Sequence, residues 1–286
     1  IQGTKLPEHV DSIEAKGIQS VKVIDSKPIG ANVRSTVATY DGVFDDLRKL
    51  FARTADAKAK GLTAGDFSYN TGKLRCPVCD GTGIITMDVQ FLPDVDTICP
   101  SCGGSRYGKD AYDILWKSKE KDSVSVSLPG LLKLTVEEAA GILHEETKIA
   151  KQLKILQDLG VCYLTLGEAT PALSGGEAQR LKLAYEMETP QQGSVFVFDE
   201  PTIGLHPQDV KKLVLIFDHL IQLGATVIVI EHDLELVTNC DYIIDMGPWG
   251  GTEGGRVVVE GTPEAVAATS ESITGRYLKQ ELAEDK

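Results

Sequence analysis

Residues 195–201 read Val-Phe-Val-Phe-Asp-Glu-Pro, and residues 227–233 read Val-Ile-Val-Ile-Glu-His-Asp. Each stretch is a run of four apolar residues, the length of a buried β-strand, followed at once by ionisable side chains. The sequence between them predicts a helix that begins at Pro207 and ends before Gly224. Four apolar residues of this helix recur at helical spacing: Leu213, Ile216, Phe217 and Leu220. Strand, helix and strand in this order predict a parallel sheet covered by helices on both faces.

The ends of these two strands carry the first candidate site. Because the carboxyl ends of neighbouring parallel strands meet at one edge of a sheet, we expect Asp199, Glu200 and His232 to converge. A carboxylate at Asp199 suits Mg²⁺ held jointly with nucleotide phosphates. Glu200 is a candidate general base for an attacking water, and His232 is a candidate contact to the γ-phosphate. The alternative is two solvated acids beside a structural histidine.

A second candidate site is the segment Leu173-Ser-Gly-Gly-Glu-Ala-Gln-Arg180. Ser174 and Glu177 have the spacing of a capping box, which predicts the start of a helix there. Gly175 and Gly176 leave the backbone bare at this end, where amide hydrogens suit a phosphate. An ordinary capped helix is the alternative. The same capping pattern at Thr135–Glu138 predicts another helix start.

Four of the six cysteines form two Cys-x-x-Cys pairs, Cys76 with Cys79 and Cys99 with Cys102, separated by nineteen residues. This spacing predicts one structural zinc ion held by four thiolates, with no open position for catalysis. A redox pair is the competing interpretation. The same pattern is found in chaperone zinc repeats, so the spacing indicates zinc and not DNA.

The composition limits the class of protein. With 286 residues, 42% of them hydrophobic and 25% charged, the chain is neither disordered nor fibrous and is long enough for about two domains. Its net charge of −13 argues against coating nucleic acid with the whole surface. No apolar run approaches the roughly 20 residues of a membrane span. The sequence begins without an initiator Met or a signal peptide, so we expect a piece of a longer, cytoplasmic polypeptide.

The remaining patterns suggest how the chain is organised. We expect a strand at 21–24, an amphipathic helix at 43–51 and a loop at 117–127. The predicted division is an N-terminal part (1–72), a zinc module with a hairpin (73–112), a helical region (113–172) and a C-terminal lobe (173–286). Residues 34–75 hold eight basic and five acidic side chains, a local net charge of +3.

Together, these motifs resemble the ABC-type ATPases. Ser174–Arg180 matches their signature motif, Asp199 and Glu200 match Walker B, and His232 matches the switch histidine. The turn Thr202-Ile-Gly-Leu-His206 replaces the Leu-Asp ending of most members and is similar to the UvrA proteins of bacterial nucleotide excision repair. Further stretches that fit this group are Pro28-Ile-Gly30, Ala38-Thr-Tyr40, Gly42–Asp46, Asp241–Gly247, Gly261–Glu264 and Thr274–Leu278.

The resemblance covers nearly the whole chain and implies the C-terminal ATPase half of such a protein. The implied fold is an α/β ATPase lobe with a parallel-rich sheet covered by helices, an inserted helical signature region and a small four-cysteine zinc module. The implied cofactors are zinc, ATP and magnesium, with nucleotide bound by Ser174, Gly175, Gly176, Gln179 and Asp199. The implied partners are damaged duplex DNA, the next repair subunit and a second copy of the full-length protein.

The resemblance leaves DNA contacts less defined. Candidate contacts are Arg34, Arg48, Lys73, Arg75 and Arg106. A solvated charged face is the alternative, since acids outnumber bases within the zinc module itself. Two other functions stay open: a UvrA-like paralogue in drug tolerance, and a zinc-dependent partner-binding module with a degenerate ATPase.

The phosphate loop of an ATPase, Gly-x-x-x-x-Gly-Lys-Ser/Thr, has one near match, at residues 103–110. We reject it because Asp110 replaces the metal-binding hydroxyl and the segment follows a zinc knuckle instead of a strand. By resemblance, we expect the loop to precede Ile1 and this chain alone to be inactive. The family's glutamine ahead of Pro28 is also replaced, since Asp25-Ser26-Lys27 occupies its place.

Overall fold

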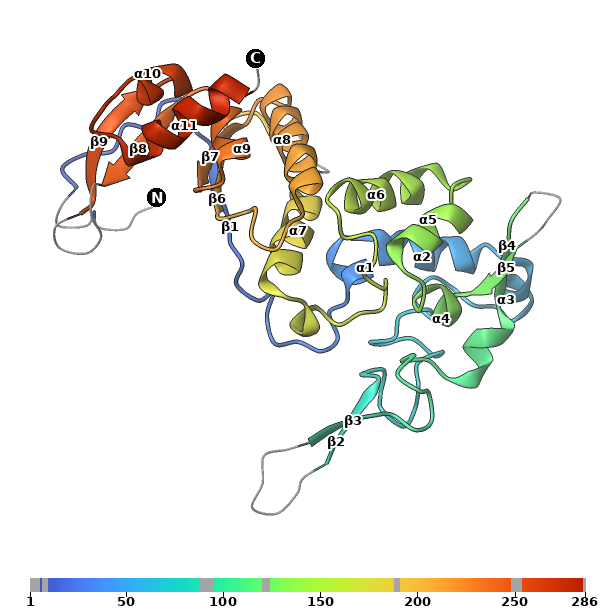
Figure 1. Cartoon of the computed structure of the whole chain (residues 1–286). Coiled ribbons are helices and arrows are strands. Elements are labelled where there is room, and N and C mark those ends of the chain that lie inside the picture. Colours follow the sequence, from blue (N-terminus) through green and yellow to red (C-terminus); the bar gives the residue numbers. More distant parts are fainter. Residues whose placement is uncertain are drawn as a thin grey trace. The chain divides into compact units, whose positions relative to one another are not determined.

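The computed structural model describes residues 6, 10–87, 95–119, 124–187, 191–247 and 254–284. The chain divides into two compact units. Figure 1 shows the elements of the chain, coloured along the sequence. Unit 1 combines residues Ile1–Asp25 with Pro190–Lys286, and unit 2 comprises Ser26–Thr189. The four-part division expected from the sequence stays a prediction.

Unit 1 contains the predicted parallel sheet. Its elements are β1 (Ser20–Ile24), β6 (Ser194–Asp199), α8 (Pro207–Gln222), β7 (Thr226–Ile230), α9 (Leu234–Thr238), β8 (Ile243–Gly247), β9 (Arg256–Gly261), α10 (Pro263–Ala267) and α11 (Ile273–Glu284). The sheet has the order β1-β6-β7, with all strands parallel. In register, Val23 lies beside Val197, and Val197 lies beside Ile228.

Helix α8 covers one face of this sheet. Phe198 on β6 packs against Phe217 on α8, with ring centroids 4.7 Å apart, and the predicted apolar face of α8 is buried. On the other face, Val23 and Ile228 remain 60% and 50% exposed. The expectation of cover on both faces is therefore not met in the described part of the chain, because the apolar layer over the sheet lies on one side only.

The C-terminal part of unit 1 packs around its own small core. Strands β8 and β9 pair antiparallel, and Ile243, Val266 and Leu278 form a buried cluster beneath them. Asp245 accepts hydrogen bonds from the hydroxyls of Ser272 (2.6 Å) and Thr274 (2.8 Å), which fixes the start of α11 to the hairpin.

Unit 2 is mainly helical. Its elements are α1 (Val37–Tyr40), α2 (Val43–Ala52), α3 (Ala55–Ala59), β2 (Ile84–Met87), β3 (Val95–Ile98), the 3-10 helix η1 (Lys109–Asp113), β4 (Leu115–Lys117), β5 (Ser125–Ser127), α4 (Leu128–Leu131), α5 (Val136–Ile142), α6 (Thr147–Asp158), the 3-10 helix η2 (Thr170–Ala172) and α7 (Gly175–Glu186). Its buried apolar side chains include Leu47, Phe51, Leu153 and Leu156, which belong to α2 and α6.

The helix starts predicted from capping boxes are confirmed. The Thr135 hydroxyl accepts from the Glu138 amide at the start of α5, and the Ser174 hydroxyl accepts from the Glu177 amide at the start of α7. In each case the glutamate side chain accepts in return from the backbone of the capping residue. The helix expected at 43–51 is also confirmed, as α2.

The expected loop at 117–127 is partly wrong. Its ends form the short antiparallel strands β4 and β5, in which Leu115 pairs with Ser127 and Lys117 with Ser125. Three-residue strands are too short to give a clear alternating pattern, so the sequence did not reveal them. Among the residues that the structure describes, no helix has both the length and the apolar character needed to cross a membrane.

Candidate functional site

The carboxyl ends of β6 and β7 bring the predicted catalytic residues together in unit 1. Asp199 lies beside Ile230 in the strand register, and the Glu200 amide donates to the Ile230 carbonyl at 2.9 Å. His232 follows two residues later, and its Nδ1 lies 3.6 Å from Oε1 of Glu200. The geometry therefore gathers a candidate metal-binding carboxylate, a candidate base and an imidazole at one sheet edge.

Glu200 has an unusual backbone conformation for the candidate base. Its φ of 45° lies in the left-handed region, which a non-glycine residue adopts only when its surroundings hold it there. Such strain is concentrated at functional sites, where it aims a side chain that regular strand geometry would direct elsewhere.

Glu231 organises this edge, and the sequence motifs did not single it out. Its side chain is 1% exposed. It accepts hydrogen bonds from the Thr202 amide (2.9 Å), the Thr202 hydroxyl, the His232 amide (2.7 Å) and the Asp233 amide (3.1 Å). Burial raises the pKa of the Glu231 carboxyl, but these hydrogen bonds outweigh it and leave the pKa below its usual value. Its place directly after a predicted buried strand is the signal that could have identified it.

The signature segment lies in unit 2 at the N-terminus of α7. Ser174 is exposed there, and Gly175 and Gly176 are half-buried. Glu177 is shared, since it accepts from Ser174 and also from the Tyr163 hydroxyl at 2.8 Å. The exposed capping residue and the bare glycine backbone together leave N–H and O–H groups that could donate hydrogen bonds to an anion.

Two details of this segment depart from the simple expectation. Gln179 is only 3% exposed, so its burial does not favour the direct nucleotide contact that the resemblance implies. Ser26, at the family's glutamine position, packs against the helix start: a Cβ on Gly175 would lie 2.9 Å from the Ser26 carbonyl oxygen. Gly175 is thus required for this close approach of the backbone.

The four predicted metal ligands converge. The sulfur atoms of Cys76, Cys79, Cys99 and Cys102 all lie within 4.8 Å of one another, and none of them forms a disulfide. The Cys76–Cys99 and Cys79–Cys102 sulfur separations are 4.0 Å and 3.7 Å. Tetrahedral coordination at about 2.3 Å per bond needs sulfurs about 3.8 Å apart, so this donor set fits a zinc ion. The cluster could hold one metal in unit 2.

The thiols of the cluster differ in pKa. Burial raises the pKa of Cys76, but hydrogen bonds from the backbone amides of Cys79 and Val78 outweigh it and lower the pKa to about 7. Burial raises the pKa of Cys102 to about 12. A bound metal cation would favour all four thiolates, because it supplies the positive charge that the buried thiols lack.

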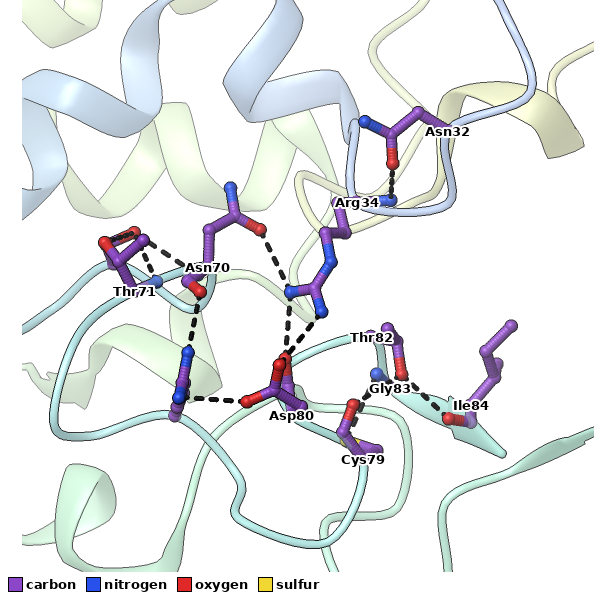
Figure 2. Close-up of polar contacts among 11 residues, drawn as sticks. Asn32, Arg34, Asn70, Thr71, Cys79, Asp80, Thr82, Gly83 and Ile84 are labelled. Carbon is purple, nitrogen blue, oxygen red and sulfur yellow. Dashed lines mark hydrogen bonds and ion pairs between the residues drawn. The ribbon is translucent and has the colours of Figure 1, made fainter. Parts of the chain in front are cut away.

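Asp80 connects this four-cysteine module to the rest of unit 2 (Figure 2). Arg34 donates to the Asp80 carbonyl at 2.8 Å and to its carboxylate at 3.3 Å, and Arg75 Nε lies 3.1 Å from the same carboxylate. Asp80 has a φ of 50°, and Gly81, the next residue, has a φ of 78°. A Cβ on Gly81 would lie 1.7 Å from the Tyr69 carbonyl oxygen, so only glycine permits this approach.

The basic residues predicted to contact DNA are mostly engaged within unit 2. Arg34 and Arg75 pair with Asp80, Arg48 pairs with Asp45, and Lys73 pairs with Asp66. These pairs offset much of the local positive charge counted from the sequence. Lys73 stays 77% exposed, whereas Arg106 is only 6% exposed, and this burial argues against a phosphate contact by Arg106.

An open pocket of about 530 Å³ adjoins the Arg34–Asp80 contact. It is lined by polar and aromatic side chains, among them Asn32, Arg34, Tyr40, Asn70 and Tyr185. Tyr40 and Tyr185 lie with ring centroids 5.7 Å apart. Arginine beside paired aromatic rings is a combination that suits nucleic acid.

Residues 103–110 do not form a phosphate loop. They run from the second cysteine pair into η1 (Lys109–Asp113), whereas a phosphate loop joins a strand to an α-helix. Arg106 within this segment also has a left-handed φ of 72°, in the turn that follows the second cysteine pair.

The fold and these sites define the class of the protein: an α/β lobe of the ABC-type ATPase fold, with a helical signature region and a four-cysteine module. The resemblance to UvrA is confirmed by similarity to known proteins. The chain is 45% identical over 264 residues to UvrABC system protein A of Staphylococcus aureus (strain COL) and 44% identical over 277 residues to that of Bacillus subtilis (strain 168). These alignments cover 92% and 96% of the chain.

A solved structure agrees. UvrA2 from Deinococcus radiodurans matches with a TM-score of 0.83 at 41% identity, over 93% of this chain and 32% of that chain. The chain spans only 27% to 28% of the length of the two UvrABC relatives, so it corresponds to a part of such a protein. No family model matches the chain.

Proposed function

We propose that this chain is part of an ATP-dependent DNA-damage-recognition protein of nucleotide excision repair. The observation that carries the proposal is the convergence of Glu200 and His232 beside Asp199 in a chain 45% identical to UvrABC system protein A. In this proposal, the whole protein binds damaged duplex DNA and uses ATP hydrolysis to load the next repair subunit.

The residues have distinct roles in this proposal. Asp199 would hold Mg²⁺, which would neutralise phosphate charge when bound with nucleotide. Glu200 orients and deprotonates the attacking water, while His232 contacts the γ-phosphate. Ser174, Gly175 and Gly176 complete the site of a second copy in a homodimer, with Gln179 assigned only by resemblance. The two copies close around ATP because charge-assisted hydrogen bonds form to its γ-phosphate, and hydrolysis of ATP removes these hydrogen bonds.

The DNA-facing part of the proposal concerns unit 2. Zinc bound by Cys76, Cys79, Cys99 and Cys102 fixes the module, and the pocket beside Arg34 supplies nearby donors and aromatic rings. Because lesions have no set sequence, we propose readout through backbone contact and duplex deformability. Reduced thiols are compatible with a cytoplasmic protein, which stays a prediction.

The test uses the full natural polypeptide that contains this chain. We expect ATPase activity that changes with lesion-containing duplex, and a loss of about 100-fold or more in turnover in Glu200→Gln with ATP binding retained. The 286-residue chain alone should hydrolyse ATP negligibly. Tighter binding to lesion-containing than to intact duplex supports the repair function, whereas equal binding to both favours the paralogue in drug tolerance. Turnover unaffected by Glu200→Gln would refute the assigned site.

A further inference from the structure

Arg106 is a buried cation for which unit 2 provides no acidic partner among its described residues. It is 6% exposed, and its Nη1 atom is buried without a hydrogen-bond acceptor. Within the described ranges, 10–87, 95–119, 124–187, 191–247 and 254–284, no carboxylate lies in ion-pair distance of its guanidinium. A buried charge without compensation destabilises the folded chain, so its retention needs a source of negative charge nearby.

The surroundings of Arg106 point to the cysteine cluster as that source. Its guanidinium lies 5.2 Å from the ring centroid of Tyr69. Burial lowers the pKa of Arg106, and Tyr69, Cys79 and Cys102 act in the opposite direction when they carry negative charge. Gly83 leaves room for the side chain, since a Cβ there would be 3.2 Å from Cγ of Arg106. The backbone of Arg106 also belongs to the module, because its carbonyl accepts from the Cys76 amide at 2.9 Å.

The charge of the loaded cluster explains why a cation belongs here. Zinc held by four thiolates carries a net double negative charge, which is itself costly to bury. Side chains that lie beside metal ligands typically change the metal affinity of the site. A guanidinium stays charged at neutral pH, so it suits this role. Each buried charge thus offsets the other once metal is bound. Other nearby arginines are less suited, because Arg34 and Arg75 are already paired with Asp80.

We propose that Arg106 is a positioning residue that compensates the charge of the metal-loaded cysteine cluster and raises its metal affinity. This rests on the proposed zinc site. It replaces the DNA contact expected for Arg106 from the sequence. It also makes a distinctive prediction: Arg106 stabilises the loaded chain, and its charge is a burden in the metal-free chain.

The experiment compares Arg106→Met with Arg106→Lys and with Lys109→Met in the 286-residue chain. Lys109→Met removes the same charge from an exposed position of the same module. Zinc affinity is measured by competition with a chromophoric chelator, and thiolate coordination is followed by the absorbance of the Co²⁺-substituted chain. We expect Arg106→Met to lose about 10- to 100-fold in affinity, Arg106→Lys to recover most of it, and Lys109→Met to change it less than about threefold.

Stability of the reduced, metal-free chain separates charge compensation from packing. Removing an uncompensated cation should leave the urea midpoint of metal-free Arg106→Met unchanged or raised, while the midpoint of the loaded variant falls. A fall in both states shows a packing role and overturns the proposal, as does an affinity equal to that of Lys109→Met. A wild-type chain that binds neither Zn²⁺ nor Co²⁺ would instead refute the underlying metal site.

Discussion

The carboxylate of Glu231 accepts hydrogen bonds from both the backbone amide and the hydroxyl of Thr202. This contact joins the end of β7 to the loop that follows β6. Glu231 also accepts from the His232 amide, so one buried side chain fixes the loop and the candidate switch histidine together. The proposed catalytic edge is therefore held by a residue that need not touch nucleotide.

We predict that Glu231→Gln destabilises unit 1 by about 2 kcal/mol at pH 7, because an amide group would face backbone donors and lose the charge-assisted hydrogen bonds. The measurement is urea unfolding of the 286-residue chain, with Glu260→Gln as the control. Glu260 is an exposed glutamate on β9 of the same unit. Equal midpoints for the two variants would contradict the role given to Glu231.

The same contact predicts a pH dependence. The folded-state pKa of Glu231 is lowered from its ordinary value of 4.5, so its contribution is fully present above that value and is lost as pH falls through the folded pKa. The stability difference between wild type and Glu231→Gln should therefore be constant from about pH 6 to 8 and shrink below about pH 4.5. Paired urea titrations at pH 7 and pH 4 measure it. A difference that grows on acidification would have the wrong sign.

The sequence predicted what depends on local pattern. Four-residue apolar runs identified β6 and β7, and capping boxes identified the starts of α5 and α7. Cysteine spacing identified the cluster of four cysteines that could hold a metal ion. These signals are local or pairwise, so they survive without knowledge of the packing.

The rest depended on contacts that no local pattern records. The pairing of Arg34 with Asp80 joins residues 46 positions apart, and burial of Arg106 depends on Tyr69 and Gly83. From the sequence, Arg34 and Arg106 are both candidate DNA contacts on the surface. In the structure, Arg34 forms an ion pair with Asp80 and Arg106 is buried. Counting charges in residues 34–75 gave their net charge, but it could not show which of these charges are paired with one another.

Gly81 offers a sharp test of how the first cysteine pair packs against the rest of unit 2. Gly81 and Gly103 both have left-handed backbones, with φ of 78° and 58°, but only a Cβ at Gly81 meets an obstacle, the Tyr69 carbonyl oxygen at 1.7 Å. Gly103→Ala should cost about 1–2 kcal/mol from backbone strain alone. Gly81→Ala should cost at least about 2 kcal/mol more and lower metal content. Thermal unfolding and metal analysis of both variants measure this, and equal losses would argue against the tight approach.

Gly175 at the start of α7 is the subject of a second prediction. Its control, Gly141, is a glycine at which the same substitution should have the opposite effect on stability. An added Cβ would lie 2.9 Å from the Ser26 carbonyl oxygen, so Gly175→Ala must shift the helix start and should lower stability by about 1–3 kcal/mol. Gly141 lies inside α5 with nothing within 4 Å of its Cβ position. Gly141→Ala should therefore raise stability by about 0.5–1 kcal/mol, through helix propensity. Chemical unfolding of the two variants should move in opposite directions, and movement in the same direction would reject the Ser26 contact.

Removal of the metal should affect one region of the chain selectively. The buried residues around the cluster are Cys76, Cys79 and Cys99, with Ile85 packed against them, and this set is too small to order the module without a metal ion. We expect about one zinc per chain.

Chelation should increase hydrogen exchange at the amides whose hydrogen bonds close the turns of the two cysteine pairs, namely those of Cys76, Gly83, Cys99 and Gly103. Leu153 and Leu156 of α6 are fully buried in the helical core, so their amides should keep their protection. Absence of metal from the reduced protein, or loss of protection throughout α6 on chelation, would show that the four cysteines do not form an independent metal-stabilised module.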